Sequence, residues 1–245
     1  MPQISDLKIK IFADGADFES MLRLYENPLI QGFTTNPTLM RKAGVTDYEE
    51  FGRRILAAIP DRPISLEVFA DDFSEMERQA CAIAEWGSNV NVKIPVTNTQ
   101  GKFSGELIRC LSARGICLNV TALMTLDQVK RVVDVLDPAA PSIVSVFAGR
   151  IADTGLDPEP IMIQARQILT SHPKAQLLWA SPRELLNIFH ADRCGTHIIT
   201  VTHDLLKKLS SVGYDLESYS LDTVRMFYND AAASAFTIAT PVAVS

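Results

Sequence analysis

Closely spaced cysteine pairs and other metal-ligand patterns are missing from this sequence. Its four cysteines form no CxxC motif, and the separation of Cys110 and Cys117 matches no usual zinc site. The histidines are scattered and form no ligand cluster. We therefore expect Cys81, Cys110, Cys117 and Cys194 to be buried, reduced thiols, and we expect neither a metal ion nor an organic cofactor.

The sequence also lacks the features of membrane, secreted and nucleic-acid-binding proteins. No apolar run reaches the ~20 residues of a membrane-spanning helix, and the opening MPQISDLKIK is too polar for a secretory signal peptide. Asp and Glu total 29 against 23 Lys and Arg, so the net charge is −6 rather than the positive value typical of nucleic-acid-binding domains. We expect a cytoplasmic protein without membrane or nucleic-acid partners. Local positive charge still allows acidic small substrates.

What the sequence has is a regular alternation of short apolar, β-branched runs with longer amphipathic segments. Strand-like runs cover residues 8–13, 29–34, 63–69, 89–94, 116–121, 142–147, 176–181 and 197–202. Helix-like segments follow at 17–26, 38–59, 73–86, 103–114, 125–136, 158–171, 182–192 and 204–212. Alternating strands and helices predict a parallel sheet. Eight such units predict an α/β fold, a closed (β/α)8 TIM barrel formed by residues 1–245 as a single domain, with a doubly wound open sheet as the alternative.

A further helix is predicted at about residues 220–236, where the sequence reads SLDTVRMFYNDAAASAF. We expect this C-terminal helix either to cover the barrel or to reach a neighbouring subunit. Local signals support several of the other helices. Asp17, Ser74 and Thr125 are candidate N-caps, and Pro182 lies near a predicted helix start.

The stretch NVNVKIPVTNTQGK, residues 89–102, places a lysine inside a strand-like run. Valine and isoleucine alternate with Asn91 and Lys93, so these two polar side chains share one face of the strand. A buried ammonium group is costly without a partner. Lys93 therefore lies either at an exposed strand end or in a pocket that uses its amine.

Other predicted strands also end in polar side chains, and in a (β/α)8 barrel the active site lies at these C-terminal ends. Any one of these residues can be explained as a solvated loop residue. Together they indicate one converging site, because buried parallel strands normally read as continuous apolar runs. The residues concerned are Asp14, the TTNPT segment 34–38, Glu67, Lys93, Asn119, Thr121 and Ser145.

These residue types fit the chemistry of an amine nucleophile. Burial disfavours the charged form of an amine, and a neutral lysine can attack a carbonyl to form a Schiff base. The iminium then draws electrons from a neighbouring carbon–carbon bond, so that a 3-hydroxy ketone is cleaved. Asp14 is the candidate to move the hydroxyl proton, and Glu67 with Thr121 the candidates to handle water. Asn36, Asn119 and Ser145 are candidates to hold substrate hydroxyls.

Two segments near the last strands fit a phosphorylated substrate. FAGRI places Arg150 just after one predicted strand, and ASPRE places Ser181 and Arg183 after the next. Arginine matches the geometry of phosphate, and such barrels often bind phosphate at these positions. Arg183 is equally well explained as a surface residue in the first turn of a helix.

At these residues the sequence resembles the transaldolase family, in particular its small microbial branch, which includes fructose-6-phosphate aldolase. TTNPT, ISLEV, VKIPVT, LNVTAL, SVFAGRI and WASPRE carry the resemblance, in the family's order, across about residues 8–235. The resemblance implies a (β/α)8 barrel, a Schiff-base lysine at Lys93, a catalytic aspartate at Asp14, and a catalytic water held by Glu67 and Thr121. It implies sugar-phosphate substrates bound by Thr35, Asn36, Asn119, Ser145, Phe147, Arg150, Ser181 and Arg183.

Two residues distinguish branches within this resemblance. The aldolase is expected to carry glutamine at the position of Glu67 and tyrosine at that of Phe147. Because phenylalanine cannot protonate an enamine, Phe147 favours transfer of a dihydroxyacetone unit to an acceptor over simple cleavage. The resemblance implies that such a transaldolase belongs to the pentose phosphate pathway. Three departures from common family residues, at Thr38, Ala152 and Pro182, leave the acceptor and the anionic group of the substrate open.

The alternatives are a fructose-6-phosphate aldolase that releases free dihydroxyacetone, a transaldolase for a sulfonated or otherwise modified sugar, and a non-catalytic sugar-phosphate-binding barrel. The resemblance also implies a homo-oligomer, a pentamer or a decamer. The sequence itself identifies neither the donor nor the acceptor sugar.

Overall fold

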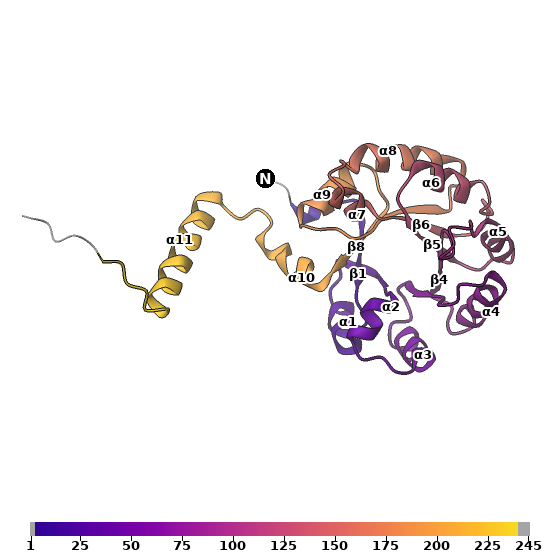
Figure 1. Cartoon of the computed structure of the whole chain (residues 1–245), viewed down its shortest axis with the longest axis horizontal. Coiled ribbons are helices and arrows are strands. Elements are labelled where there is room, and N and C mark those ends of the chain that lie inside the picture. Colours follow the sequence, from indigo (N-terminus) through magenta and orange to yellow (C-terminus); the bar gives the residue numbers. More distant parts are fainter. Residues whose placement is uncertain (1–2, 240–245) are drawn as a thin grey trace, which may run out of the picture. The chain divides into compact units, whose positions relative to one another are not determined.

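The computed structural model describes residues 3–239, which include eight parallel strands closed into a barrel (Figure 1). The strands follow one another around the barrel in chain order, and pairing of the first with the last closes it. This confirms the predicted (β/α)8 barrel over the open-sheet alternative. The strands are β1 (Lys10–Asp14), β2 (Ile30–Thr34), β3 (Ile64–Glu67), β4 (Val90–Pro95), β5 (Leu118–Leu123), β6 (Ser142–Val146), β7 (Ala175–Trp179) and β8 (Ile198–Thr202).

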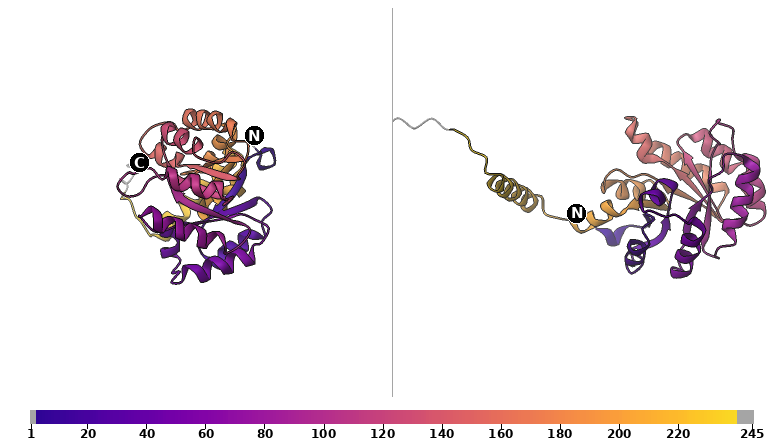
Figure 2. Two further views of the ribbon diagram at one scale, coloured as in Figure 1. Left: turned by 90° about the vertical axis from the view of Figure 1, so that its right-hand side faces the viewer. Right: turned by 60° about the horizontal axis from the view of Figure 1, so that its bottom comes forward.

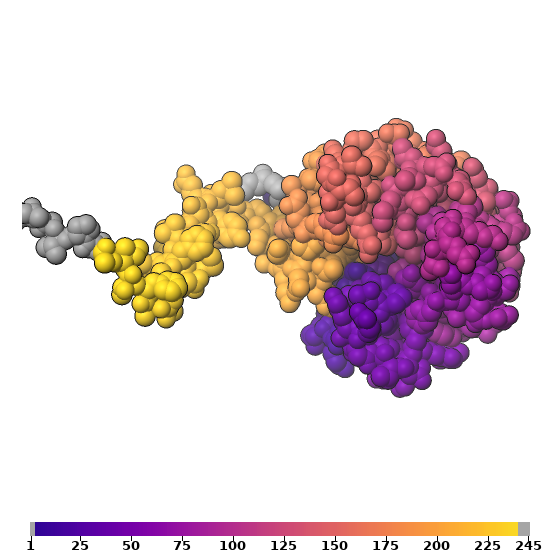
Figure 3. Space-filling view, viewed as in Figure 1, coloured from indigo at the N-terminus to yellow at the C-terminus, as the bar shows by residue number. Residues whose placement is uncertain are grey.

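Helices surround the strands on the outside of the barrel, as two further views show (Figure 2). The space-filling view shows the indigo segments of the first units beside the orange segments of the last, where the barrel closes (Figure 3). The helices of this part are α1 (Phe18–Tyr25), α2 (Pro37–Lys42), α3 (Tyr48–Ala58), α4 (Phe73–Ala84), α5 (Gly105–Ala113), α6 (Leu126–Val133), α7 (Ala148–Asp153), α8 (Glu159–Ile168), α9 (Leu186–Arg193) and α10 (His203–Leu206).

The helical segments predicted at 38–59 and from residue 182 differ from their predicted extent, and one short helix is additional. The segment 38–59 forms two helices, because the chain turns at Gly44, whose φ of 72° suits glycine, and restarts at the N-cap Asp47. The helix predicted from residue 182 begins only at Leu186. The short helix α7 follows β6 directly and was not predicted.

The predicted helix caps are confirmed at two of three positions. The side chains of Asp17 and Thr125 accept hydrogen bonds from backbone N–H groups of the helices that follow them. Ser74 is not a cap, since Asp72 caps α4 and accepts from the backbone N–H of Ser74. Aspartate two residues earlier therefore competes successfully for the same role.

The chain divides into two compact units, and the barrel belongs to the unit of residues 7–209. The described part of the other unit consists of residues 3–6 and 210–239, and it contains α11 (Leu216–Ala233). This helix begins before the predicted residue 220, because the Asp215 side chain accepts from the backbone N–H of Ser218 and caps it.

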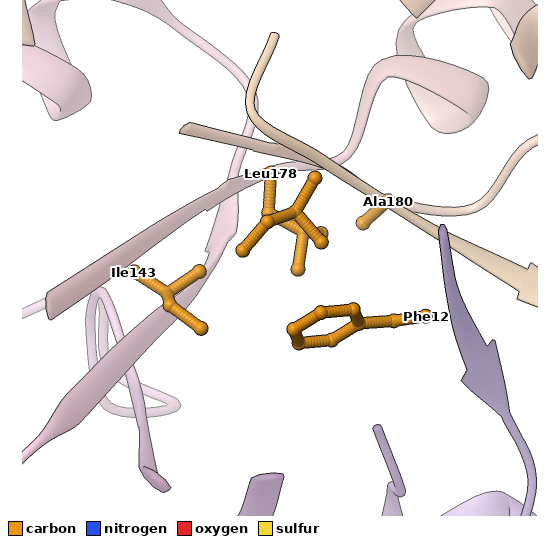
Figure 4. Close-up of a cluster of buried hydrophobic side chains, with 5 residues drawn as sticks. Phe12, Ile143, Leu178 and Ala180 are labelled. Carbon is orange, nitrogen blue, oxygen red and sulfur yellow. The ribbon is translucent and has the colours of Figure 1, made fainter. Parts of the chain in front are cut away.

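An apolar cluster fills the barrel interior below the polar strand ends. Figure 4 shows Phe12, Ile143 and Leu178 pointing toward one another. A Cβ atom on Gly32 would lie 2.5 Å from Cζ of Phe12, so glycine at this position makes room for the ring. Phe12 and Ile143 each lie two residues before a polar residue of the same strand face, Asp14 and Ser145. The cluster therefore forms the floor beneath the polar layer. Its members are Phe12, Ile143, Leu178, Ala180 and Ile198.

Candidate active site

A cavity of about 570 Å³ lies at the C-terminal ends of the strands. All the site residues predicted from the sequence, except Thr35, line it. These are Asp14, Asn36, Glu67, Lys93, Asn119, Thr121, Ser145, Phe147, Arg150, Ser181 and Arg183. The barrel therefore brings together side chains from positions more than 150 residues apart in the chain.

Lys93 projects from β4 into this cavity and is paired there. Its side chain is 8% exposed, and its Nζ lies 2.9 Å from Oε2 of Glu67. Nζ also donates a hydrogen bond to the carbonyl oxygen of Thr35, at 2.7 Å. These partners offset the cost of burying an ammonium group. The Glu67 carboxylate is thus close enough to Nζ of Lys93 to exchange a proton with it directly.

Thr35 contributes its backbone rather than its side chain. On β2, Thr34 lines the cavity, and successive side chains of a strand point to opposite faces. The Thr35 hydroxyl is accordingly buried away from the cavity and donates to the carbonyl oxygen of Ser65, at 2.9 Å. Its own carbonyl oxygen is the acceptor for Lys93.

Asp14 ends β1 with its carboxylate held by a neighbouring strand. The hydroxyl of Thr34 donates to Oδ1 of Asp14 at 2.7 Å, and the hydroxyls of Thr34 and Thr200 are hydrogen-bonded to each other. Burial raises the pKa of Asp14 above its ordinary value of 3.8, although Lys93 and the Thr34 hydrogen bond act in the opposite direction. A carboxyl group with a raised pKa is better suited to take up and release a proton near neutral pH.

Thr200 was not among the predicted site residues, and Thr34 was predicted only as part of the TTNPT segment, without a role of its own. Both line the cavity, on β2 and β8. Thr200 shares its strand face with Ile198, whose side chain belongs to the interior cluster. The signal in the sequence was a polar residue inside the strand-like run 197–202.

A second set of polar groups connects β3, β5 and β6 beside the lysine. Nδ2 of Asn119 donates to the hydroxyl of Ser65 at 3.0 Å. The hydroxyl of Ser145 donates to Oδ1 of Asn119 at 2.6 Å. All three side chains are buried. The chain of hydrogen bonds fixes the orientation of the Asn119 amide and the Ser145 hydroxyl at the cavity wall.

Two arginines supply positive charge at the β6 and β7 side of the cavity. The guanidinium of Arg150 lies over the ring of Phe147, 5.3 Å from its centroid. Arg183 donates to Asp153 of α7 through both Nε and Nη2, with Nε 2.9 Å from Oδ1. An anionic ligand at this side could therefore bind the guanidinium of Arg150, and it would compete with Asp153 for the guanidinium of Arg183.

A further basic residue at the cavity, Lys42, comes from the C-terminal end of α2. Nothing in its local sequence distinguishes it from a surface lysine in the last turn of a helix. It lines the cavity because of the direction that α2 takes after β2, and this direction is set by tertiary packing.

The backbone is strained at two places in the cavity wall. Ala122 and Ser181 have φ values of 67° and 59°, in the left-handed region that non-glycine residues rarely adopt. A Cβ atom on Gly149 would lie only 1.5 Å from the carbonyl oxygen of Ser181, so glycine lets α7 approach this loop. Strain of this kind clusters at functional sites, and here it adjoins Thr121 and the arginine side of the cavity.

Two negative findings apply to residues 3–239. No group of three or more His, Cys, Asp or Glu side chains is arranged to hold a metal ion. No helix in that range is long and apolar enough to cross a membrane.

Comparison with known proteins identifies the family of this chain. The sequence profile described as Transaldolase/Fructose-6-phosphate aldolase matches residues 11–238. The chain belongs to this family. "Probable transaldolase" of Dehalococcoides mccartyi is 34% identical over 82% of this chain and 90% of its own length. "Probable transaldolase 2" of Listeria monocytogenes is 33% identical over 83% of this chain and 89% of its own length. Membership supports a transaldolase-type enzyme.

Solved structures outside the close relatives share the barrel alone. A putative lyase/mutase from Burkholderia cenocepacia has a TM-score of 0.57 at 12% identity and covers 85% of each chain. Dihydrodipicolinate synthase from Rhodopseudomonas palustris has a TM-score of 0.52 at 16% identity and covers 91% of this chain and 79% of its own. At such identities the likeness describes the fold, and the transaldolase family assignment depends on the sequence matches.

Proposed function

We propose that the enzyme transfers a dihydroxyacetone unit from a ketose phosphate, such as sedoheptulose 7-phosphate or fructose 6-phosphate, to an aldose phosphate through a Schiff base on Lys93. The observation that carries the proposal is the ion pair of buried Lys93 with partly buried Glu67, 2.9 Å apart, in the same cavity as Asp14. Family membership supports the reaction type.

The first half of the proposed reaction forms the imine. Glu67 takes a proton from Lys93, and the neutral amine attacks the ketone carbon of the donor. Glu67 then returns its proton to the hydroxyl of the resulting carbinolamine, which leaves as water, with Thr121 beside it in the cavity wall. The product is an iminium that can accept electrons from the neighbouring carbon–carbon bond.

The second half breaks and remakes that bond. Asp14 takes the proton from the hydroxyl next to the scissile bond, the bond electrons move into the iminium to give an enamine, and the aldose phosphate leaves. The enamine then attacks the acceptor aldehyde, and Asp14 returns its proton to the new hydroxyl. Hydrolysis of the imine, with Glu67 moving protons in the reverse order, releases the product ketose.

The remaining cavity residues are assigned to holding the substrate. Asn36, Asn119 and Ser145 would bind hydroxyls, the last two through the hydrogen-bonded chain described above. Arg150, Ser181 and Arg183 would bind the phosphate, since two guanidinium groups lie at that side of the cavity. We further propose a cytoplasmic homo-oligomer, a pentamer or decamer, on the basis of the family resemblance.

Acceptor dependence is the first test of this function. Because Phe147 has no hydroxyl to protonate the enamine, we expect donor consumption to be at least about tenfold faster with an aldose phosphate acceptor than without one. Donor, acceptor and free dihydroxyacetone would be quantified over a panel of donors and acceptors. Equal rates with and without acceptor would indicate a fructose-6-phosphate aldolase, and no consumption under either condition would indicate a binding protein.

The variant Phe147→Tyr sharpens this test. A phenol at this position of the cavity is expected to raise the fraction of donor released as free dihydroxyacetone, at the expense of transfer. The matched control is Phe18→Tyr, which adds the same hydroxyl on α1, outside the residues that line the cavity. An unchanged ratio of release to transfer in Phe147→Tyr would contradict the proposal that the missing hydroxyl at Phe147 is what favours transfer.

A further inference from the structure

The backbone of Glu67 lies where β3 loses its neighbour. β2 pairs with β3 up to Thr35, whose N–H donates to the carbonyl oxygen of Ser65 at 3.1 Å. After Thr35 the chain leaves the sheet, because Asn36 caps α2. Alternate residues of a parallel strand direct their backbone groups to the same neighbour. The N–H and C=O of Glu67, two residues after Ser65, therefore face the side that β2 has vacated.

Tyr48 fills this position with its side chain. The N–H of Glu67 donates to Oη of Tyr48 at 2.8 Å, and Oη donates to the carbonyl oxygen of Glu67 at 3.0 Å. One hydroxyl thus satisfies both backbone groups and continues the sheet's hydrogen bonding by one residue. We propose that Tyr48 is a positioning residue of the active site. It fixes the end of β3 so that the Glu67 carboxylate stays in contact with Nζ of Lys93.

Tyr48 is itself held firmly enough for this role. It is the first residue of α3, which Asp47 caps. Its ring contacts Phe69, with centroids 4.4 Å apart, and the edge of Trp86, at 5.5 Å. Gly52 makes room for Trp86, since a Cβ atom there would lie 2.6 Å from Cε3 of the indole. Burial raises the pKa of Tyr48, so the hydroxyl keeps the proton that it donates.

The opposite edge of the strand end is already secured by β4. Glu67 pairs with Lys93 in the β3–β4 register, and the N–H of Val68 donates to the carbonyl oxygen of Lys93 at 3.2 Å. Removing the Tyr48 hydroxyl would leave the strand end bound on one edge only. The Glu67 side chain would then sample positions away from Nζ, and proton transfer during imine formation and hydrolysis would slow. This consequence rests on the proposed function of the Lys93–Glu67 pair.

The test uses Tyr48→Phe, which keeps the ring and removes the hydroxyl. Loss of two hydrogen bonds at a buried backbone site predicts a fall in kcat of about tenfold, with KM within about twofold and with imine formation as the slowed step. The matched control is Tyr25→Phe. Tyr25 donates its hydroxyl to Asp61, at 2.5 Å, away from the cavity, and its removal is expected to leave kcat unchanged.

A double variant separates positioning from a general structural role. If Tyr48 acts through Glu67, adding Tyr48→Phe to Glu67→Gln lowers kcat by less than about twofold, because the group being positioned has already lost its function. A further tenfold loss in that background would overturn the inference. So would a Tyr48→Phe enzyme as active as the unmodified one. Absence of both turnover and a Lys93 adduct in the unmodified enzyme would instead contradict the proposed function.

Amide hydrogen exchange tests the same contact without any variant. The Glu67 N–H of the unmodified protein is expected to be protected to a degree similar to that of Leu66, which pairs within the β3–β4 ladder. Exchange of the Glu67 amide at the rate of an unbonded, solvent-exposed amide would overturn the inference even if Tyr48→Phe failed to fold.

Discussion

Replacing Lys93 by methionine is expected to reduce ketose turnover by on the order of 10⁶-fold, the size of loss seen when a covalent nucleophile is removed. Methionine preserves an unbranched side chain of similar length but cannot form an imine. Turnover would be measured with the best donor and acceptor pair. Because Glu67 loses its cationic partner and stays largely buried, the variant is also expected to unfold at a lower temperature than the unmodified enzyme.

The matched control for this variant is Lys102→Met, in the same stretch of sequence. Lys102 lies 5.5 Å from the ring centroid of Phe73, outside the residues that line the cavity. Its replacement should leave turnover within about twofold, the scatter expected of a surface substitution. Residual turnover of Lys93→Met near that of the unmodified enzyme, with the variant folded, would contradict the nucleophilic role.

Asp14→Asn is expected to lower turnover by about 10²- to 10⁴-fold, the usual contribution of general acid–base catalysis. Asparagine can still accept the hydrogen bond from Thr34 but cannot carry a proton. Because Asp14 acts after the imine has formed, the variant should still bind donor covalently at Lys93. Loss of the adduct together with turnover would show that Asp14 acts earlier than proposed.

The raised pKa of Asp14 gives this variant a pH signature. In the unmodified enzyme the acid limb of kcat should lie above pH 3.8, the ordinary value for aspartate, because burial raises the pKa of Asp14. That limb should be lost from the residual activity of Asp14→Asn.

The raised pKa of Asp14 should also make the free energy of unfolding depend on pH. The native state binds the Asp14 proton more tightly than the unfolded chain does, so the cost of the buried carboxylate is absent below pH 3.8 and complete above the raised pKa. The variant should therefore be more stable than the unmodified enzyme at neutral pH, and this gain should shrink toward acid pH. A gain that does not change with pH would contradict burial of an ionised Asp14.

The sequence was sufficient for the barrel and for most of the candidate site because both depend on strand periodicity. Alternation placed Lys93 and Glu67 on interior faces, and parallel strands bring their C-terminal ends together. It could not supply the strand register, which pairs Glu67 directly with Lys93. It also could not reveal that Lys93 would bind the backbone carbonyl oxygen of Thr35, because a backbone contact leaves no mark in the pattern of side chains. Of the two adjacent threonines, Thr34 is the one that lines the cavity.

The site contacts that could not be predicted from the sequence depend mostly on tertiary packing. Tyr48 reaches Glu67 because Gly44 breaks the predicted helix 38–59 and α3 packs its first residue against the end of β3. Lys42 reaches the cavity because α2 ends beside it. Neither contact has a periodic signal, because each depends on loop length and helix placement rather than on the local pattern of apolar residues.

Borohydride trapping of the donor would detect the proposed Schiff base on Lys93 itself. The enzyme would be incubated with fructose 6-phosphate, reduced with borohydride and digested, and the peptide containing residues 89–102 would be analysed by mass spectrometry. We expect Lys93 to carry a reduced adduct of the donor ketose or of its dihydroxyacetone unit, formed only when donor is present, and Lys102 of the same stretch to carry none. Consumption of donor with Lys93 unmodified would contradict this expectation.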